Sequence, residues 1–292
     1  MYEWFISRRY LRAKHRHGFI SLISLISVIG ITVGVIALIV VLSVYSGFTD
    51  GLRDQILGIN SHIIVQRVEG AIDNYDLKRD QVLSVEGVNG ATPYLYAQTL
   101  VSGTAGGSGI ILRGIEPETA KKVVSLSEQM IAGSIDDLTF DQDERLPPII
   151  LGAQLADDLR VSVGGKVRLI SPSGPLTPMG VIPKIKTCRI AGIFESGMYE
   201  YDSSLAYMHI HAVQEFLEVG DVAHGIEVLV DKELLNKADE VAQAIVSKVG
   251  PGTIARDWMS MNRNLFAAFK LEKIGIFICV ALIILVAALN II

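Results

Sequence analysis

Two long stretches without a charged residue lie near opposite ends of the chain. One runs from Gly18 to Thr49 and the other from Ile274 to Ile292, and a polar stretch from Asp50 to Lys273 separates them. About 20 helical residues cross the roughly 30 Å hydrocarbon core of a bilayer, so each stretch is long enough to span a membrane. The pattern predicts two membrane-spanning helices that flank a domain outside the bilayer, and it excludes a purely soluble protein.

Apolar residues continue at helical spacing beyond Val44, through the end of the first stretch, and also before the second stretch. They are Phe48, Leu52, Ile56 and Ile59 beyond Val44, and Trp258, Met261, Leu265, Phe266 and Phe269 before the second stretch. This spacing among charged residues predicts amphipathic helical stalks that connect the domain to the membrane. The pattern fits stalks that transmit movement and stalks that only pack on each other or on the domain equally well.

The polar stretch mixes short strand-like and helix-like segments. Runs rich in β-branched residues and bounded by Gly, Pro, Ser or Asp predict strands over 62–68, 97–101, 109–114, 149–151, 166–170, 189–193, 205–210 and 226–230. Helical spacing predicts helices over 116–126, 153–159, 212–218 and 231–249. Interleaved helices and short strands indicate an α+β domain. The Gly-rich segment 102–109 is predicted to be a hairpin or loop.

The predicted organisation follows from these segments. It comprises a cytoplasmic N-terminus (1–18), a first transmembrane helix (19–46), an extracytoplasmic domain with its stalks (47–273) and a second transmembrane helix (274–292). Because the chain closes inside an apolar run without a polar flank, it is expected to be a fragment of a longer protein.

The distribution of charged residues predicts how the chain is oriented in the membrane. Residues 1–17 carry five basic side chains against Glu3 alone, which leaves a net charge of −9 for the rest of a chain whose formal charge is −5. Lys and Arg beside a first hydrophobic helix hold that end in the cytoplasm, so the domain is predicted to be extracytoplasmic. Its acidic balance excludes a nucleic-acid-binding face. A cleavable signal peptide is disfavoured because the apolar run is much longer than about 7–15 residues and no clear A-x-A site follows.

Catalytic and metal-binding motifs are absent from the sequence. No H-E-x-x-H, C-x-x-C, P-loop or G-x-S-x-G pattern occurs, so the chain is predicted not to be an enzyme and to carry no cofactor or metal of its own. His209 and His211 lie two apart in a predicted strand and could share a metal, but a structural pair is favoured because no further ligand is near. Cys188 and Cys279 fall in different segments and are predicted to remain unpaired.

One loop is unusual for its length and composition. Residues 171–187 read S-P-S-G-P-L-T-P-M-G-V-I-P-K-I-K-T between two predicted strands, a connection of about 18 residues that carries apolar side chains at its centre. Loops this long in compact domains tend to be functional or disordered. Apolar residues on a proline-stiffened arm favour docking to a partner, because less entropy is lost on binding. The alternative is an arm folded back onto its own domain.

Several segments resemble a known family. The run from Gly30 to Phe48 with Leu52 and Ile56-Leu57-Gly58, the opening Phe5 to Leu11 and the segment Ser21 to Ile29 resemble the permease subunits of the lipoprotein-releasing ABC transporter, the LolC/LolE type. The segment Thr177-Pro178-Met179-Gly180 with Ile182-Pro183 resembles the hook of the LolC-type subunit. The chain departs from the family at Tyr45-Ser46, where relatives usually have Met-Asn, and at Lys184-Ile185-Lys186 after the hook.

The resemblance implies an inner-membrane transporter subunit with four spans and a MacB-like periplasmic domain. Such a subunit works with a second permease subunit, either a copy of itself or a hookless paralogue, and with a cytoplasmic ATPase dimer that binds ATP and Mg. The complex extracts lipoproteins from the outer leaflet of the inner membrane and delivers them to the periplasmic carrier LolA.

The resemblance also assigns two groups of residues. The carrier-binding hook is expected at Thr177, Pro178, Met179, Gly180, Ile182, Pro183 and Lys186. Contacts with the acyl chains of the lipoprotein are expected at the outer end of the first span, at Val41, Val44, Tyr45 and Phe48.

Two other functions fit the same layout. A sensor receptor with an extracytoplasmic ligand-binding domain also has two spans. A related permease-like efflux protein or cell-wall mechanotransmitter is a closer alternative but needs no Pro-rich hook. Further apolar spans after Ile292 would favour the transporter, and a heptad-rich soluble tail would favour the receptor.

Overall fold

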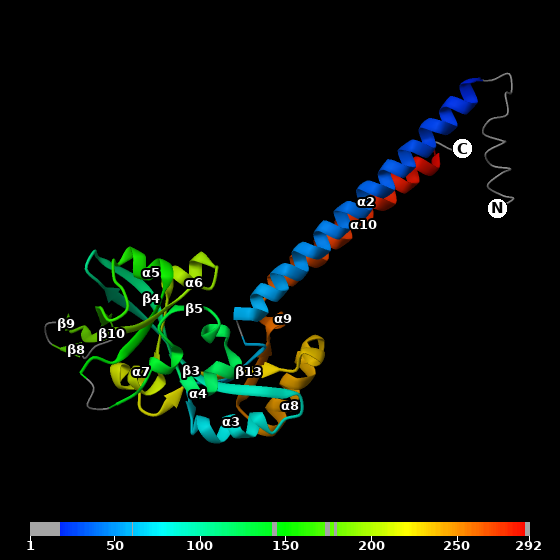
Figure 1. The fold of residues 1–292 in the computed structure, drawn as a ribbon. Coiled ribbons are helices and arrows are strands. Elements are labelled where there is room, and N and C mark those ends of the chain that lie inside the picture. Colours follow the sequence, from blue (N-terminus) through cyan, green and yellow to red (C-terminus); the bar gives the residue numbers. More distant parts are fainter. Residues whose placement is uncertain (1–17, 60, 142–144, 173–175, 178–179, 290–292) are drawn as a thin grey trace. The chain divides into compact units, whose positions relative to one another are not determined.

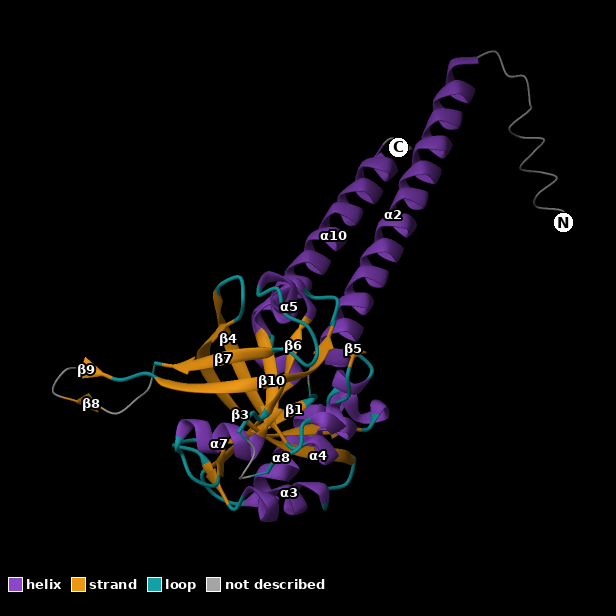
Figure 2. Cartoon of the chain, turned by 60° about the vertical axis from the view of Figure 1, so that its left-hand side comes forward, coloured by secondary structure: helices purple, strands orange, loops and turns teal. Residues whose placement is uncertain are grey.

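The computed structural model describes residues 18–59, 61–141, 145–172, 176–177, 180–289 of the chain. They form two compact units, one made of Met1–Asp54 with Asn262–Ile292 and the other of Gln55–Met261. The boundaries predicted between membrane spans and domain stay predictions. Figure 1 colours the chain along the sequence, and Figure 2 separates helices from strands.

The first unit consists of two long helices. Helix α2 covers Gly18–Ile59 and helix α10 covers Arg263–Leu289. Among the described residues, the segment Val28–Thr49 of α2 is long and apolar enough to cross a membrane. Hydroxyl groups within it donate to the backbone of the preceding turn, Thr32 to the carbonyl of Val28 and Thr49 to that of Tyr45, which satisfies them in apolar surroundings.

The two helices contact each other through small and half-buried side chains. In α2 these are Gly34, Leu38, Tyr45 and Thr49, spaced four and seven residues apart as in a helix–helix seam. A Cβ atom on Gly34 would lie 3.3 Å from Cγ2 of Ile283 in α10. The second predicted span lies in α10 as far as Leu289, and its last three residues are outside the described part.

The second unit is built on a mixed β-sheet. Its strands follow the order β14-β1-β13-β3-β4-β11-β6-β10-β5, and β7 pairs with both β10 and β3. Their bounds are β1 Ile63–Arg67, β3 Val88–Ser102, β4 Gly107–Ile115, β5 Met130–Ala132, β6 Pro148–Gly152, β7 Lys166–Ser171, β10 Lys184–Phe194, β11 Leu205–His209, β13 Gly225–Val230 and β14 Thr253–Asp257. Two short pairs, β2 (Ile72–Asp73) with β12 (Val222–Ala223) and β8 (Leu176–Thr177) with β9 (Gly180–Val181), complete the strands.

Helices cover both faces of this sheet. They are α3 Tyr75–Leu83, α4 Pro117–Val123, α5 Ala153–Asp158, α6 Tyr199–Ser204, α7 Ile210–Leu217, α8 Ala238–Val249 and α9 Trp258–Met261, with 3-10 turns η1 Ser125–Ser127, η2 Ile135–Asp137 and η3 Lys232–Lys237. Helix α4 packs a core that includes Ile115, Phe194 and Tyr207. Helix α7 covers the opposite face, where Gly114 leaves room for Ile210 and Val213. Adjacent residues of β4 therefore serve two cores, as period-two side-chain alternation requires.

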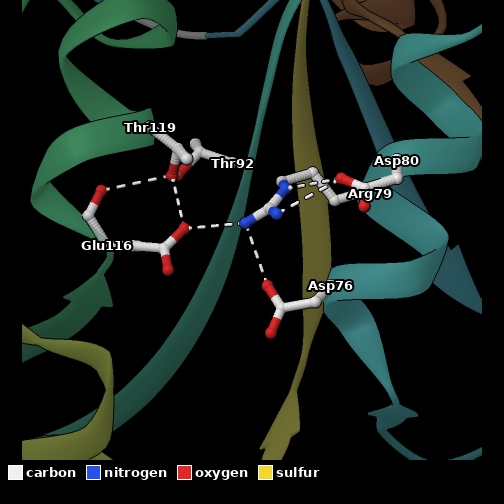
Figure 3. Close-up of polar contacts among 6 residues, drawn as sticks. All are labelled: Asp76, Arg79, Asp80, Thr92, Glu116 and Thr119. Carbon is white, nitrogen blue, oxygen red and sulfur yellow. Dashed lines mark hydrogen bonds and ion pairs between the residues drawn. The ribbon is translucent and has the colours of Figure 1, made fainter.

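A charged network connects α3 with the start of α4 (Figure 3). Arg79 Nη1 lies 2.9 Å from Oδ1 of Asp76 and 3.0 Å from Oε2 of Glu116, and its Nη2 lies 3.2 Å from Asp80. Thr119 donates to the same oxygen of Glu116 at 2.9 Å. Only 18% of the Arg79 side chain is exposed, so this network is better shielded from water than an isolated surface pair and has a structural role.

The predicted α+β pattern is confirmed, and each predicted strand has a counterpart. The helix predicted over 231–249 divides into η3 and α8, and the one over 116–126 divides into α4 and η1. The segment 102–109 is a hairpin, in which Ser102 pairs with Gly107. The pattern did not predict α3, α6 or β14.

Candidate functional site

The loop predicted at 171–187 is a hairpin arm. Strand β10 already begins at Lys184, which pairs with Ser171 of β7, so the predicted connection of about 18 residues was too long. Beyond this ladder, β8 and β9 pair with each other, Leu176 opposite Val181 and Thr177 opposite Gly180. Figure 2 shows this pair standing clear of the main sheet. The described residues of the arm thus form a short strand pair that follows the β7–β10 hairpin.

The described residues of the arm expose apolar side chains. Ile182 is 55% exposed and Ile185 is 63% exposed, and Pro183 between them is also exposed. Among the other predicted hook residues, Thr177 and Gly180 form the β8–β9 pair, whereas Pro178 and Met179 lie outside the described residues. Exposed branched side chains on a projecting hairpin form a surface that a protein partner can cover.

The predicted cation of the hook is engaged within the domain. Lys186 Nζ lies 3.2 Å from Oε1 of Glu215 in α7, and Lys184 Nζ lies 2.7 Å from Oε2 of Glu218, the C-cap residue that follows this helix. Both lysines are half-buried. The basic side of the arm therefore faces α7, and Ile185, between them in the strand, faces away.

The residues predicted to contact acyl chains divide into two groups. Val41, Val44 and Phe48 are exposed on α2, which leaves them available to lipid. Tyr45 is half-buried instead, and its hydroxyl donates to the carbonyl oxygen of Phe269 in α10 across 2.9 Å. Tyr45 thus lies at the seam between the two helices, and the exposed Val41 and Phe48 lie beside it on the helix surface.

The two histidines considered as metal ligands belong to a helix start. His211 lies in α7 and not in a strand, because His209 caps this helix by accepting a hydrogen bond from the backbone N–H of His211. Phe140 stacks on the ring of His209, with 5.5 Å between centroids. The pKa of His209 is lowered to about 4, mainly because the ring is buried and to a smaller extent because His211 is nearby. No group of three or more metal-ligating side chains occurs in the described part of the chain.

Sequence reasoning missed a buried polar cluster in the centre of the sheet. Arg113 of β4 forms an ion pair with Glu227 of β13, and both residues are at most 3% exposed. The guanidinium also lies 5.5 Å from the ring centroid of Tyr96 and 5.6 Å from that of Tyr207. Burial disfavours its charge, but Glu227 raises the pKa of Arg113 above its ordinary value. The signal in the sequence was the pair of charges within two otherwise apolar strands.

Cys188 is also buried, in β10. Burial raises the pKa of its thiol to about 12, so it is protonated at neutral pH and is a poor nucleophile. Among the described residues, the arm and the exposed Val41, Val44 and Phe48 of α2 offer apolar surface for binding.

Comparison with known proteins decides the family. The MacB-like periplasmic core domain matches residues 24–247. The chain is 38% identical over 295 residues to "Lipoprotein-releasing system transmembrane protein LolC" of Neisseria meningitidis serogroup B, an alignment that covers 99% of this chain and 69% of the relative. The chain belongs to the LolC family of lipoprotein-releasing transmembrane proteins.

Two further similarities accompany this membership. The chain is 32% identical to the LolC protein of Xylella fastidiosa strain Temecula1, covering 98% of this chain and 68% of that one. Among solved structures, the periplasmic region of MacB from Actinobacillus actinomycetemcomitans is similar with a TM-score of 0.48 and 11% identity, over 73% of this chain and 95% of that one. The predicted family and the predicted MacB-like α+β domain are confirmed. This LolC-family chain is a permease subunit, which agrees with a non-catalytic role.

Proposed function

We propose that this chain extracts lipoproteins from the outer leaflet of the inner membrane and passes them to a soluble periplasmic carrier of the LolA type. Membership of the LolC family along almost the whole chain supports this function. The observation that carries the handover is the hairpin arm, with Ile182 exposed beyond the paired part of β10 and Ile185 exposed within β10 at the base of the arm. Sensor function has no comparable support.

The energetics of this task require partners. Each CH₂ group of an acyl chain is worth about 0.8 kcal/mol in the bilayer, so removing several chains costs tens of kcal/mol. The chain shows no nucleotide-binding motif that could supply this free energy. In the proposal, a cytoplasmic ATPase dimer binds ATP and Mg, and a second permease subunit, identical or a LolE-type paralogue, completes the membrane part.

The α2 stripe gives the extracted acyl chains a first apolar surface. Val41, Val44 and Phe48 lie within about 60° of one another around the helix, because positions three and seven apart share a helix face. All three are at least 50% exposed. Placed at the outer end of a membrane span, such a stripe receives acyl chains as they leave the bilayer.

Release from proteoliposomes tests the proposal. The full-length protein is reconstituted with its second permease subunit and ATPase, a radiolabelled lipoprotein is incorporated, and soluble lipoprotein is measured after ATP and carrier are added. Release that requires both ATP and carrier supports the function. Release that occurs equally without carrier removes the handover from the proposal.

A further inference from the structure

Two ion pairs connect the base of the arm to α7. Lys184 and Lys186 are two residues apart in β10, so their side chains leave the strand on the same side. Lys184 reaches Glu218 at 2.7 Å, and Lys186 reaches Glu215 at 3.2 Å. These four residues are called the arm brace below.

At Lys184 the brace is better shielded from water than an ordinary surface ion pair. The Lys184 side chain is only 19% exposed, and its Nζ also donates to the carbonyl oxygen of Leu217, the last residue of α7, at 3.4 Å. The final carbonyls of a helix lack intrahelical partners and carry partial negative charge, which a cation stabilises. Glu218 itself adopts a left-handed conformation, with φ 58°, that ends α7 beside the arm.

The brace determines which side of the arm remains free. Because Lys184 and Lys186 are held against α7, Ile185 is directed to the other face of the strand and is 63% exposed. The strand pairing agrees with this orientation. Lys186 lies opposite Leu169 and Lys184 opposite Ser171 in β7, so the two lysines share one face of the sheet. The pairs of Lys184 with Ser171 and of Lys186 with Leu169 are at the end of the β7–β10 ladder nearest the arm, so loss of the brace would loosen this end and free the arm to bend there.

We propose that Lys184, Lys186, Glu215 and Glu218 are positioning residues that hold the arm in a carrier-ready orientation. This inference rests on the proposed function of the arm. It gives Lys186 a role within the domain, in place of the direct carrier contact that the family resemblance implies. A pre-oriented arm loses less conformational entropy when a partner binds, so the brace raises affinity without touching the partner.

Charge-reversal variants distinguish a positioning role of Lys186 from a direct contact between Lys186 and the carrier. In the full complex, Lys186→Glu is expected to weaken carrier binding about three- to tenfold, the effect of one or two partly shielded ion pairs. Adding Glu215→Lys restores the pair with its sign reversed and should recover most of the affinity. Rescue should be weaker for Lys184→Glu with Glu218→Lys, because the reversed residue at 184 still faces the carbonyl oxygen of Leu217.

A distance measurement without carrier tests the brace on its own. Spin labels at Ile182 and Leu77, both exposed, should show a broadened distance distribution in each single variant and a narrowed one in the 186/215 double variant. Lys121→Glu is the matched control, since Lys121 forms an ion pair with Asp136 of η2, which is not part of the arm. It should change neither the distribution nor carrier affinity.

The outcomes distinguish this inference from the proposed function. An unchanged distribution in Lys186→Glu, with lost carrier binding that Glu215→Lys does not rescue, would make Lys186 a direct contact and overturn the brace. If the distributions behave as expected while the wild-type complex captures no carrier, the brace stands and the proposed handover fails.

Discussion

The hydroxyl group of Tyr45 in α2 donates a hydrogen bond to the carbonyl oxygen of Phe269 in α10, 2.9 Å away. Together with Gly34, which faces Ile283, it marks two points along one seam between the helices. Apolar side chains near the C-terminal end of the apolar segment of α2, including Val44 and Phe48, are left exposed. The seam therefore determines which face of α2 can meet lipid or acyl chains.

Substituting Gly34 tests this seam. Gly34→Leu should push α2 and α10 apart, because even a Cβ atom there would lie 3.3 Å from Ile283, closer than ordinary van der Waals contact. Spin labels at Val40 and Leu282, both exposed, would report a longer and broader distance. Gly30→Leu is the control, because nothing lies within 4 Å of its Cβ position. Equal distances in the two variants would refute the seam.

Removing one partner of the buried Arg113–Glu227 ion pair should strongly destabilise the domain, whereas replacing both partners with apolar residues should destabilise it much less. Arg113→Met leaves the carboxylate of Glu227 buried without its partner, which typically costs about 3–5 kcal/mol of unfolding free energy. Adding Glu227→Leu removes that charge and should recover most of the loss. Urea unfolding of the full chain in detergent, followed by fluorescence of the buried Trp258 in a Trp4→Phe background, measures both. A double variant as unstable as the single one would contradict this account.

His209 should make the domain less stable in mild acid. Its pKa is lowered to about 4 by burial and by His211, whereas a histidine in an unfolded chain titrates near 6.5. Between these values the unfolded state binds more protons, so the stabilisation present above about pH 6.5 is lost as the pH falls toward 4.

A capping substitution isolates this effect. His209→Asn keeps an acceptor for the start of α7, because Asn is a favoured N-cap residue, but removes the titrating ring. The variant should match the wild type at pH 8 and lose less stability at pH 5. Some pH dependence should remain, since burial also lowers the pKa values of His62 and His224. Identical profiles for both proteins would remove His209 as a source.

The sequence predicted the elements with strong periodicity and missed those that depend on tertiary contacts. Uncharged runs and β-branched segments identified α2 and the central strands, because burial on one or both sides leaves a clear pattern. Helix α3 has a polar composition, and part of its support comes from Arg79 bridging to Glu116, a contact 37 residues away that no local pattern contains.

The candidate site could be predicted only in part, because it also depends on tertiary contacts. The unusual composition of 171–187 located the arm, but its pairing through Lys184 and Ser171 depends on register between strands. The direction of Tyr45 and the pairing of Lys186 with Glu215 depend on neighbouring helices. Exposed apolar residues could be assigned from sequence, whereas the partners of polar side chains could not.

Carrier capture by the arm is the most direct test of the central claim. The full complex is reconstituted in nanodiscs, and binding of labelled carrier is titrated for the wild type, for Ile182→Asp and for the control Leu77→Asp, which changes another exposed apolar residue, in α3. Loss of one buried Ile contact of about 1.5–3 kcal/mol predicts a weakening of at least about tenfold for Ile182→Asp. The control should bind as the wild type does. Equal affinities for all three proteins would contradict the claim that this arm receives the carrier.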